Sequence, residues 1–282
     1  MNKFLSEIDA TLDLIRPPNL IITALTVWVG GVLVGGGEYL LDSTLFMAAF
    51  AAALVAAGGN AVNDAYDEDI DLINRPQRPI PSGRLDYVKA FKLGGGLLIL
   101  GVGFSFYLMP SLGMIALTVA ALLWMYSLWL KRTVLLGNFA IAFCGGMAFI
   151  YGAAAVENPS GGMYPALFAF LVHLGREIIK DVEDVAGDRL CGAMTLPVVM
   201  GNRSALKGAV IVLIALIIAT FIPYWTGKYS LNYLKLVVIL VDLPLLLIIL
   251  FLRKGLESRG LRWVSQALKL IMVGGLAALY VG

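Results

Sequence analysis

Acidic and amide side chains occur in two groups that share one internal spacing. The first group is Asn60, Asp64, Asp67 and Asp71, and the second is Glu177, Asp181, Asp184 and Asp188. Every member of the second group follows its counterpart by 117 residues. Spacings of 4, 3 and 4 residues place the four side chains within an arc of about 60° on a helix. We therefore expect each group to form a one-sided column of oxygen ligands at a helix end.

These oxygen ligands favour a divalent metal site. A single acidic column would indicate only a solvated helix face, but two matched columns repel internally unless cations lie between their carboxylates. The absence of His and Cys from both groups favours Mg2+ over Zn2+, and Mg2+ usually completes its coordination with substrate phosphates. The predicted Mg2+ ligands are Asp64, Asp67, Asp71, Asp181, Asp184 and Asp188, of which Asp64, Asp67, Asp181 and Asp184 are also predicted to be catalytic.

Basic residues near the acidic groups indicate a phosphorylated ligand. They are Arg16, Lys131, Arg132 and Arg176, together with three arginines of the proline-rich segment 74–84, Arg75, Arg78 and Arg84. Each of them alone is more typical of an interfacial anchor. Beside Mg2+, however, they would together surround a phosphate group with charged donors.

Three further polar residues lie deeper than the aspartates. Asn60 and Glu177 are one turn deeper, where they could ligate the metal or orient its ligands. His173 is one turn deeper again, on the face of Glu177. We expect His173 to be buried and hydrogen-bonded to a neighbouring helix, because its counterpart in the first half is Ala56.

The elements that position these groups must lie in a membrane. The sequence of 282 residues is 60% hydrophobic and 14% charged, with a mean hydropathy of +0.86, which is too apolar for a soluble globule. A net charge of +2 gives no bulk attraction to polyanions, so nucleic-acid binding is excluded. Cys144 lies in an apolar run and Cys191 in a polar one, so no disulfide framework is expected. No protein partner can be inferred.

Nine stretches are long and apolar enough to cross the bilayer as helices. The uncharged stretch 93–130 contains Pro110 and Gly113 near its middle, so we expect two helices joined by a tight turn. Asp242 and Lys269 interrupt the last two stretches. The predicted spans are 17–37, 43–63, two within 93–130, 133–156, 158–175, 208–227, 231–252 and 263–282.

The basic residues predict the orientation of these spans. With nine spans, every Lys and Arg except Lys228 and Lys235 falls on one side, which the positive-inside rule assigns to the cytoplasm. We expect a multi-pass protein of the cell membrane whose active site faces the cytoplasm, with long connections at about 67–90 and 185–205. Because the acidic groups are four spans apart, two parallel four-helix repeats plus a ninth helix are expected.

The first acidic group carries a resemblance to a known family. Segment 63–71 reads NDAYDEDID and resembles the Asn-Asp-x-x-Asp-x-x-x-Asp signature of the UbiA-type intramembrane prenyltransferases. The second group falls where that superfamily carries its second Asp-rich motif. Also similar are segments 14–19, 74–76 and 126–132, so the resemblance covers nearly the whole chain. More narrowly, segments 75–84 and 173–184 resemble the archaeal digeranylgeranylglyceryl phosphate synthase branch.

The resemblance implies a fold, a cofactor and a reaction. The fold is an all-α integral membrane domain over residues 1–282, with nine transmembrane helices around a central cavity. The reaction is Mg2+-dependent transfer of a geranylgeranyl group from its diphosphate to the sn-2 hydroxyl of geranylgeranylglyceryl phosphate, so a prenyl diphosphate donor, a lipid phosphate acceptor and membrane lipid are the partners. The substrate-binding residues implied are Arg16, Asn19, Asn60, Asn63, Arg75, Arg78, Arg84, Tyr126, Lys131, Arg132, Arg176, Glu177 and Lys180.

Two other functions remain open. A prenyltransferase acting on an aromatic quinone precursor needs only a small polar pocket, whereas a glyceryl lipid phosphate needs a second cationic site and a second apolar groove. A lipid or ion transporter also carries repeats and intramembrane charges, but transporters place those charges near the midplane. Here Asp242, Lys269 and His173 lie within predicted spans, and Lys235 lies near one end of the span 231–252. Release of diphosphate from a prenyl diphosphate would separate an enzyme from a transporter.

Overall fold

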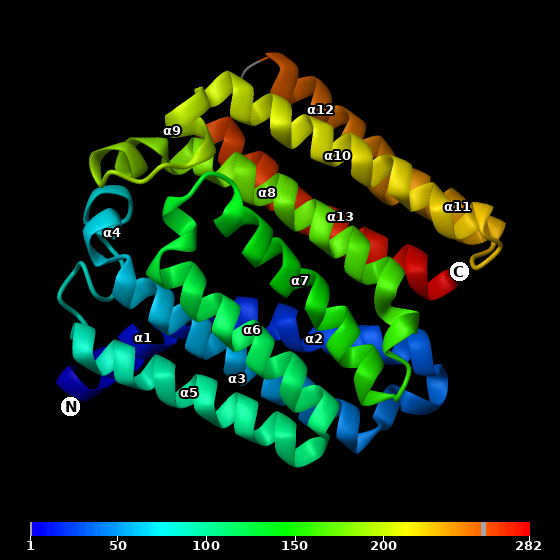
Figure 1. Cartoon of the computed structure of the whole chain (residues 1–282), viewed down its shortest axis with the longest axis horizontal. Helices are drawn as coiled ribbons and strands as arrows, with labels where there is room; N and C mark the ends of the chain where they lie inside the picture. Colours follow the sequence, from blue (N-terminus) through cyan, green and yellow to red (C-terminus); the bar gives the residue numbers. More distant parts are fainter. Residues whose placement is uncertain (1, 255–257) are drawn as a thin grey trace. The chain divides into compact units, whose positions relative to one another are not determined.

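A computed structural model of the protein describes residues 2–254 and 258–282, which form helices and short connections without a β-strand (Figure 1). The α-helices are α1 (Asn2–Ile15), α2 (Pro17–Gly35), α3 (Ser43–Tyr66), α4 (Glu68–Asn74), α5 (Tyr87–Leu108), α6 (Pro110–Leu128), α7 (Leu136–Ala155), α8 (Met163–Leu190), α9 (Leu196–Met200), α10 (Asn202–Trp225), α11 (Leu231–Val237), α12 (Leu243–Lys254) and α13 (Ser258–Val281). Short 3-10 turns are η1 (Gly37–Leu41), η2 (Leu130–Arg132) and η3 (Pro159–Gly162), and η4 (Val238–Asp242) is a π turn.

Eight helical segments in the described ranges are long and apolar enough to cross a membrane. They correspond to eight of the nine predicted spans, and the ninth, 158–175, falls on the N-terminal part of α8. That helix is less apolar because its 28 residues also carry the second acidic group. The prediction of an all-α protein with many membrane-crossing helices is confirmed. The count of nine and the parallel repeats stay predictions.

The chain divides into two compact units. Unit 1 comprises residues 1–131 and 147–162, and unit 2 comprises residues 132–146 and 163–282. The boundary crosses α7, whose N-terminal part belongs to unit 2 and whose C-terminal part belongs to unit 1. The interpretation of residues 1–282 as a single domain with two cytoplasmic caps stays a prediction.

The central helix of unit 1 is α3, which packs against α2, α5 and α6. Glycines allow α3 and α5 to approach closely. A Cβ atom on Gly58 would lie 2.7 Å from the carbonyl oxygen of Gly94, and one on Gly101 would lie 2.7 Å from Val55 Cγ2. Small residues are the usual means of close helix packing in membranes. This packing holds the C-terminal end of α3, where the first acidic group begins.

Sequence rules locate the turn between α5 and α6 correctly. Helix α5 ends at Leu108, and α6 begins at Pro110. Proline is suited to the first position of a helix because the missing N–H has no intrahelical partner there. The predicted pair of helices within 93–130 is therefore confirmed, although α5 begins earlier, at Tyr87, because its polar first turn extends beyond the apolar stretch.

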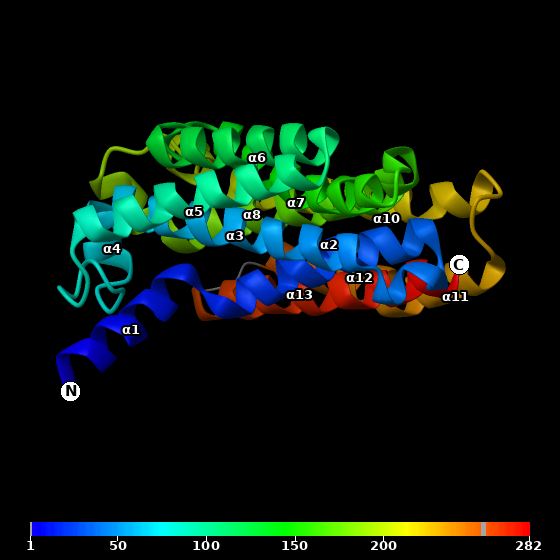
Figure 2. The same cartoon turned by 90° about the horizontal axis from the view of Figure 1, so that it is seen from below.

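Helix α1 precedes the first span and diverges from α2 (Figure 2). Ala10 and Leu14 are fully buried and pack with Ala61 and Ala65 of α3. The chain turns between α1 and α2 at Arg16, whose φ of 58° and ψ of 69° are left-handed. This conformation is uncommon for a residue other than glycine. The contact between α1 and α3 therefore holds Arg16 beside the end of α3.

The first acidic group does not lie on one helix, so the prediction of a continuous helical column is wrong here. Helix α3 ends at Tyr66, and Asp67 caps it with φ −94° and ψ 4°. Helix α4 follows at once and carries Glu68, Asp69 and Asp71 in its first turn. Negative charge is unfavourable at a helix C-terminus and favourable at an N-terminus. The break thus converts an unfavourable position for these acids into a favourable one.

In unit 2, α8 packs against α10 and α13. Gly175 permits close contact with α10, because a Cβ atom there would lie 2.9 Å from Leu213 Cδ2. The second acidic group lies entirely on α8, as predicted. In the predicted span 231–252, Asp242 occupies the π turn, and its Oδ1 accepts a hydrogen bond of 3.1 Å from the Thr220 hydroxyl. This intramembrane carboxyl group is therefore satisfied within the protein.

Candidate functional site

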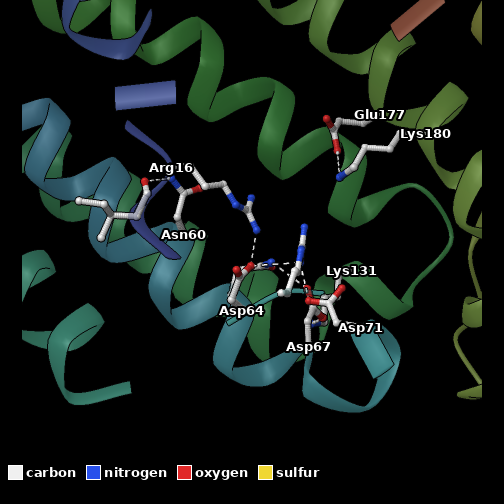
Figure 3. A network of polar contacts seen from close by, with 11 residues as sticks. Arg16, Asn60, Asp64, Asp67, Asp71, Lys131, Glu177 and Lys180 are labelled. Carbon is white, nitrogen blue, oxygen red and sulfur yellow. Dashed lines mark hydrogen bonds and ion pairs between the residues drawn. The ribbon is translucent and has the colours of Figure 1, made fainter. Parts of the chain in front are cut away.

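Asp64 lies at the centre of an ion-paired cluster at the end of α3 (Figure 3). Its Oδ1 accepts hydrogen bonds from Arg16 Nη2 and, at 3.1 Å, from Arg78 Nη1. Arg78 Nη1 also donates to Asp71 Oδ2. The side chains of Asp64 and Asp71 are only 4% and 5% exposed. One guanidinium group thus bridges two buried carboxylates that come from consecutive helices.

Asp67 receives its own cation and an amide. Lys131 Nζ forms an ion pair with Asp67 Oδ1, and Asn63 Nδ2 donates to Asp67 Oδ2 at 2.7 Å. The Lys131 side chain comes from η2, after α6, and is 7% exposed. Among the described residues, the buried Oδ1 of Asn63 has no hydrogen-bond partner. An unsatisfied acceptor therefore lies beside a carboxylate in this cluster.

Asn60 positions Arg16 and does not face the carboxylates with its amide. Its Nδ2 donates to the carbonyl oxygen of Ile15 at 2.9 Å, and Ile15 is the last residue of α1. The hydrogen bond joins the turn before α2 to α3, one helical turn from Asp64. Because it fixes the backbone immediately before Arg16, it aims the guanidinium group at Asp64.

Burial and charge oppose each other in this cluster. Burial lowers the pKa of the Arg16 guanidinium group, although the neighbouring Asp64 acts in the opposite direction. Burial likewise raises the pKa of the Asp71 carboxyl group, and the ion pair with Arg78 opposes that shift. Buried charges persist when they are paired and hydrogen-bonded. Arg16, Arg78 and Lys131 therefore offset the repulsion that the acidic spacing predicts.

The second acidic group in unit 2 has a different environment. Glu177 Oε1 accepts a hydrogen bond of 2.7 Å from Arg176 Nη1, and Lys180 Nζ lies 3.6 Å from Glu177 Oε2 (Figure 3). Both cations belong to α8 itself. Asp181 Oδ2 accepts from Asn138 Nδ2 of α7 at 2.7 Å. At the end of α8, Asp188 Oδ2 accepts a hydrogen bond of 3.0 Å from the Thr195 hydroxyl. Asp181 and Asp188 thus accept hydrogen bonds from neutral side chains.

Arg84, Arg132 and Asn19 have hydrogen bonds to groups other than the carboxylates of the two acidic groups. Arg84 Nη1 donates to Asp13 Oδ2 of α1 at 2.8 Å, so its side chain is directed to α1 and not to Asp64. The side chain of Arg132 is exposed, and its carbonyl oxygen accepts from the Met194 amide at 2.8 Å. Asn19 lies in the first turn of α2, and its backbone N–H donates to the Arg16 carbonyl oxygen at 2.9 Å. The remaining predicted residues are partly buried and are Arg75 at the end of α4, Tyr126 on α6 and Asp184 on α8.

His173 lacks the expected hydrogen bond at one of its two ring nitrogens, within the described part of the chain. Its ring lies against α7, where a Cβ atom on Gly145 would be 2.8 Å from His173 Nε2. Within the described part of the chain, its buried Nδ1 has no hydrogen-bond partner. The expected hydrogen bond to a neighbouring helix is therefore not formed at this nitrogen.

Sequence reasoning missed two hydrogen-bonding partners of the second group. Asn138 lies 43 residues before Asp181 and is buried on α7. An isolated amide in the otherwise apolar stretch 133–156 was the available signal, because polar groups in membrane helices usually bond to another helix. Thr195 had no comparable signal, since it lies in a polar connection. Its contact with Asp188 arises only from the turn after α8.

The oxygen-rich chemistry of both groups fits Mg2+. Among the described residues, no three His, Cys, Asp or Glu side chains converge as a metal-binding group. Mg2+ does not require such a group, because one or two carboxylates and substrate phosphates suffice. Beside the first group, the unsatisfied Asn63 oxygen lies on the amide that contacts Asp67, and both residues offer oxygen atoms of the kind that Mg2+ binds. The nearby guanidinium and ammonium groups are suited to bind phosphate oxygens.

Comparisons with known proteins agree with this chemistry. The UbiA prenyltransferase family matches residues 23–271. The chain is 39% identical to the digeranylgeranylglyceryl phosphate synthase of Methanopyrus kandleri and 36% identical to that of Hyperthermus butylicus, covering 96% and 98% of each pair of chains. A solved structure of a digeranylgeranylglyceryl phosphate synthase matches with a TM-score of 0.79 at 31% identity over 98% of both chains.

A more distant solved structure shares the fold. The UbiA homologue of Archaeoglobus fulgidus, bound to dimethylallyl diphosphate and Mg2+, matches with a TM-score of 0.70 at 17% identity, covering 96% of this chain and 99% of that chain. The family match and the apolar helices together identify an integral multi-pass membrane protein. The chain belongs to the UbiA prenyltransferase family.

Proposed function

We propose that this protein transfers a geranylgeranyl group from geranylgeranyl diphosphate to the sn-2 hydroxyl of geranylgeranylglyceryl phosphate. The observation that carries the proposal is the first acidic cluster, in which Asp64, Asp67 and Asp71 lie among Arg16, Arg78 and Lys131. Such a cluster offers carboxylates to a metal and cationic donors to a diphosphate. The identity of 39% and 36% to synthases of archaeal ether lipid supports the choice of substrates.

The aspartates of both groups are the proposed Mg2+ ligands. Bound Mg2+ would stabilise the negative charge that grows on the diphosphate oxygens as the allylic carbon–oxygen bond breaks. Arg16, Arg78 and Lys131 add hydrogen bonds to the same leaving group. They contact the carboxylates in the structure, so they need only exchange one anionic partner for another. Asn63 orients Asp67 through its amide.

The remaining step is capture of the allylic carbon by the acceptor hydroxyl. The carbon–oxygen bond to the diphosphate breaks with its electron pair on oxygen, the ether bond forms from the sn-2 oxygen, and the hydroxyl proton leaves. Water would compete for the same carbon. Apolar helices around the reacting groups exclude that water. A carboxylate of either acidic group, or the departing diphosphate, accepts the proton.

The proposal is tested with purified protein in detergent. Geranylgeranyl diphosphate is supplied with Mg2+ and one acceptor at a time, and products are identified by mass. We expect digeranylgeranylglyceryl phosphate and an equal amount of diphosphate, with both lost in EDTA. Formation of a prenylated aromatic product in place of the lipid product would contradict the proposal and favour a prenyltransferase that acts on a quinone precursor. No diphosphate release with any acceptor would favour a transporter.

We also propose nine transmembrane helices in two parallel repeats, with the site facing the cytoplasm. The basic residues support this orientation, since Arg75, Arg78 and Arg84 all follow α3 and such residues are retained on the cytoplasmic side. A cysteine at 86 in a chain without Cys144 and Cys191 should react with an impermeant thiol reagent from the cytoplasmic side only. A cysteine at 158 should react only from the other side. Labelling of both from one side would contradict the proposed spans.

A further inference from the structure

Two buried nitrogen atoms on one face of α8 lack hydrogen-bond partners. They are His173 Nδ1 and Arg176 Nε, and neither has a partner in the described ranges of the chain. The two residues are three positions apart, so they are neighbours on the helix surface. Leaving a buried donor unsatisfied costs roughly 1 to 3 kcal/mol, and more when the group is charged. Two such groups about one helical turn apart on α8 therefore indicate a place for a hydrogen-bonding ligand.

The positions of both side chains are set by their neighbours. The Cδ2–Nε2 edge of His173 lies against the Gly145 backbone, where even a methyl group would collide with the ring. The Nδ1 atom lies on the opposite side of the ring from that edge. Arg176 is held by its Nη1, which donates to Glu177 Oε1 at 2.7 Å. The unpartnered nitrogens are thus not loose ends of mobile side chains.

The surroundings are cationic. Glu177 is a single carboxylate with Arg176 on one oxygen and Lys180 3.6 Å from the other. Lys269, half-buried on α13, is close enough to act electrostatically on His173. Helix α13 packs directly on α8. Arg176 and Lys180 thus flank the carboxylate of Glu177, and Arg176 and Lys269 act on the His173 ring, a distribution that attracts an anion.

We infer that this cluster of His173, Arg176, Lys180 and Lys269, all in unit 2, binds the phosphate monoester of the acceptor lipid. The inference rests on the proposed function and names a subsite within it. A phosphate oxygen accepts hydrogen bonds from Arg176 Nε and from the Nδ1–H of a neutral His173 ring, and Lys180 and Lys269 add positive charge. Lys269 thereby becomes a substrate-binding residue, whereas the sequence pattern indicated only a charge interrupting the last span.

The chemistry of the cluster distinguishes acceptor from donor. Arg16, Arg78 and Lys131 lie with the first acidic group and suit the diphosphate, which Mg2+ also binds. Around His173, the ligands offered are nitrogen donors, and Glu177, which acts electrostatically on the ring, is paired with Arg176. Such a donor set binds a phosphate without a metal.

A binding comparison that removes either the Lys269 charge or the lipid phosphate tests the inference. The wild type and Lys269→Gln are titrated, without donor, with geranylgeranylglyceryl phosphate and with geranylgeranylglycerol, which lacks the phosphate. Loss of one charge-assisted hydrogen bond should weaken binding of the phosphorylated lipid about ten- to a hundredfold. Binding of the alcohol should be unchanged in Lys269→Gln. Lys207→Gln, an exposed position on α10, is the matched control and should change neither affinity.

Three variants make the result independent of folding defects. Lys269→Arg keeps the charge and should restore most of the affinity. His173→Phe keeps the ring but removes Nδ1, and Gly145→Ala displaces the ring without removing any charge. Both substitutions should weaken binding of the phosphorylated acceptor more than binding of the alcohol.

Equal weakening of both lipids by Lys269→Gln would overturn the inference, as would an effect on donor affinity alone. Charge-dependent binding without product formation would instead contradict the proposed function and leave the subsite standing. Product formation without charge-dependent binding would contradict the phosphate subsite and leave the proposed function standing.

Discussion

The two acidic groups share a spacing but differ in what surrounds them. In the first, Asp64 and Asp71 are bridged by Arg78, and Asp67 is paired with Lys131. In the second, Asp181 and Asp188 accept hydrogen bonds from the neutral side chains of Asn138 and Thr195. The first group also spans a helix break, whereas the second lies on the unbroken α8.

This difference teaches that equal spacing does not imply equal electrostatics. The cations of the first group come from elsewhere in unit 1, from the turn before α2, the connection after α4 and the 3-10 turn after α6. They are placed to transfer to an anionic ligand. Asn138 and Thr195 are neutral, so their hydrogen bonds orient Asp181 and Asp188 without adding positive charge. The first group therefore combines proposed metal ligands with cationic donors for the leaving group, whereas the second group combines proposed metal ligands with neutral donors that orient them.

The largest expected effect is loss of turnover in both groups. Asp67→Asn and Asp184→Asn each remove a proposed Mg2+ ligand and should lower kcat by at least about a thousandfold, equivalent to roughly 4 kcal/mol. Single-turnover rates at saturating Mg2+ measure it. Near-normal activity of Asp184→Asn would contradict the proposed role of this residue of the second group as a metal ligand.

Stability without metal should separate the two groups next. Asp64→Asn leaves Arg16 and Arg78 without their shared carboxylate, so unfolding free energy should fall by about 3 kcal/mol. Asp181→Asn can still bond to Asn138 and should change stability by less than about 1 kcal/mol. Thermal midpoints in detergent with EDTA provide the measurement. Equal destabilisation of the two variants would mean that the cations of the first group contribute nothing specific.

Adding Arg16→Gln to Asp64→Asn tests the cause, because Arg78 remains paired with Asp71 in the single variant. If an unpaired guanidinium group produces the loss, the double variant should recover part of it, because the two substitutions then remove the same interaction. Additive losses would contradict the ion-pair explanation.

The amides that support each group should have intermediate effects. Asn138→Ala removes a charge-assisted hydrogen bond to Asp181 and should lower kcat about ten- to a hundredfold. Asn60→Ala removes a neutral hydrogen bond to the Ile15 carbonyl and should lower kcat about three- to tenfold. Asn60→Asp cannot donate to that carbonyl and should not rescue the loss, whereas Asn138→Gln should recover part of it. The reverse order of the two alanine effects would contradict the assignment of Asn60 as a positioning residue.

The smallest effect is expected at Arg84. Although it belongs to the same proline-rich segment as Arg78, its side chain pairs with Asp13 at the exposed edge of α1. Exposed pairs contribute about 0 to 1 kcal/mol. Arg84→Gln should therefore retain kcat within about twofold. Arg78→Gln should lower kcat by at least about tenfold. Assays of the two purified variants side by side measure the difference. Equal losses of kcat would place Arg84 in the site, as its position in the proline-rich segment predicts.

Much of the fold and part of the site followed from sequence patterns. The apolar stretches located the membrane-crossing helices, and Pro110 located the turn between α5 and α6. Repetition at 117 residues located both acidic groups. The helix break at Asp67 did not follow from the spacing, because a spacing of 4, 3 and 4 is equally consistent with a broken helix. Helix α1 also lacked the apolar length on which the reading of spans depended.

The sequence by itself determined which residues are available and how far apart they lie along a helix, because hydropathy and periodicity are properties of neighbouring residues. Only the tertiary structure decided which cation reaches which carboxylate. Arg78 and Arg84 are six residues apart in one segment, yet one bridges Asp64 and Asp71 and the other pairs with α1. Contacts of this kind depend on how distant segments return to one another, and on the burial that makes each pairing favourable. That information lies in the packing of the helices and not in any local pattern.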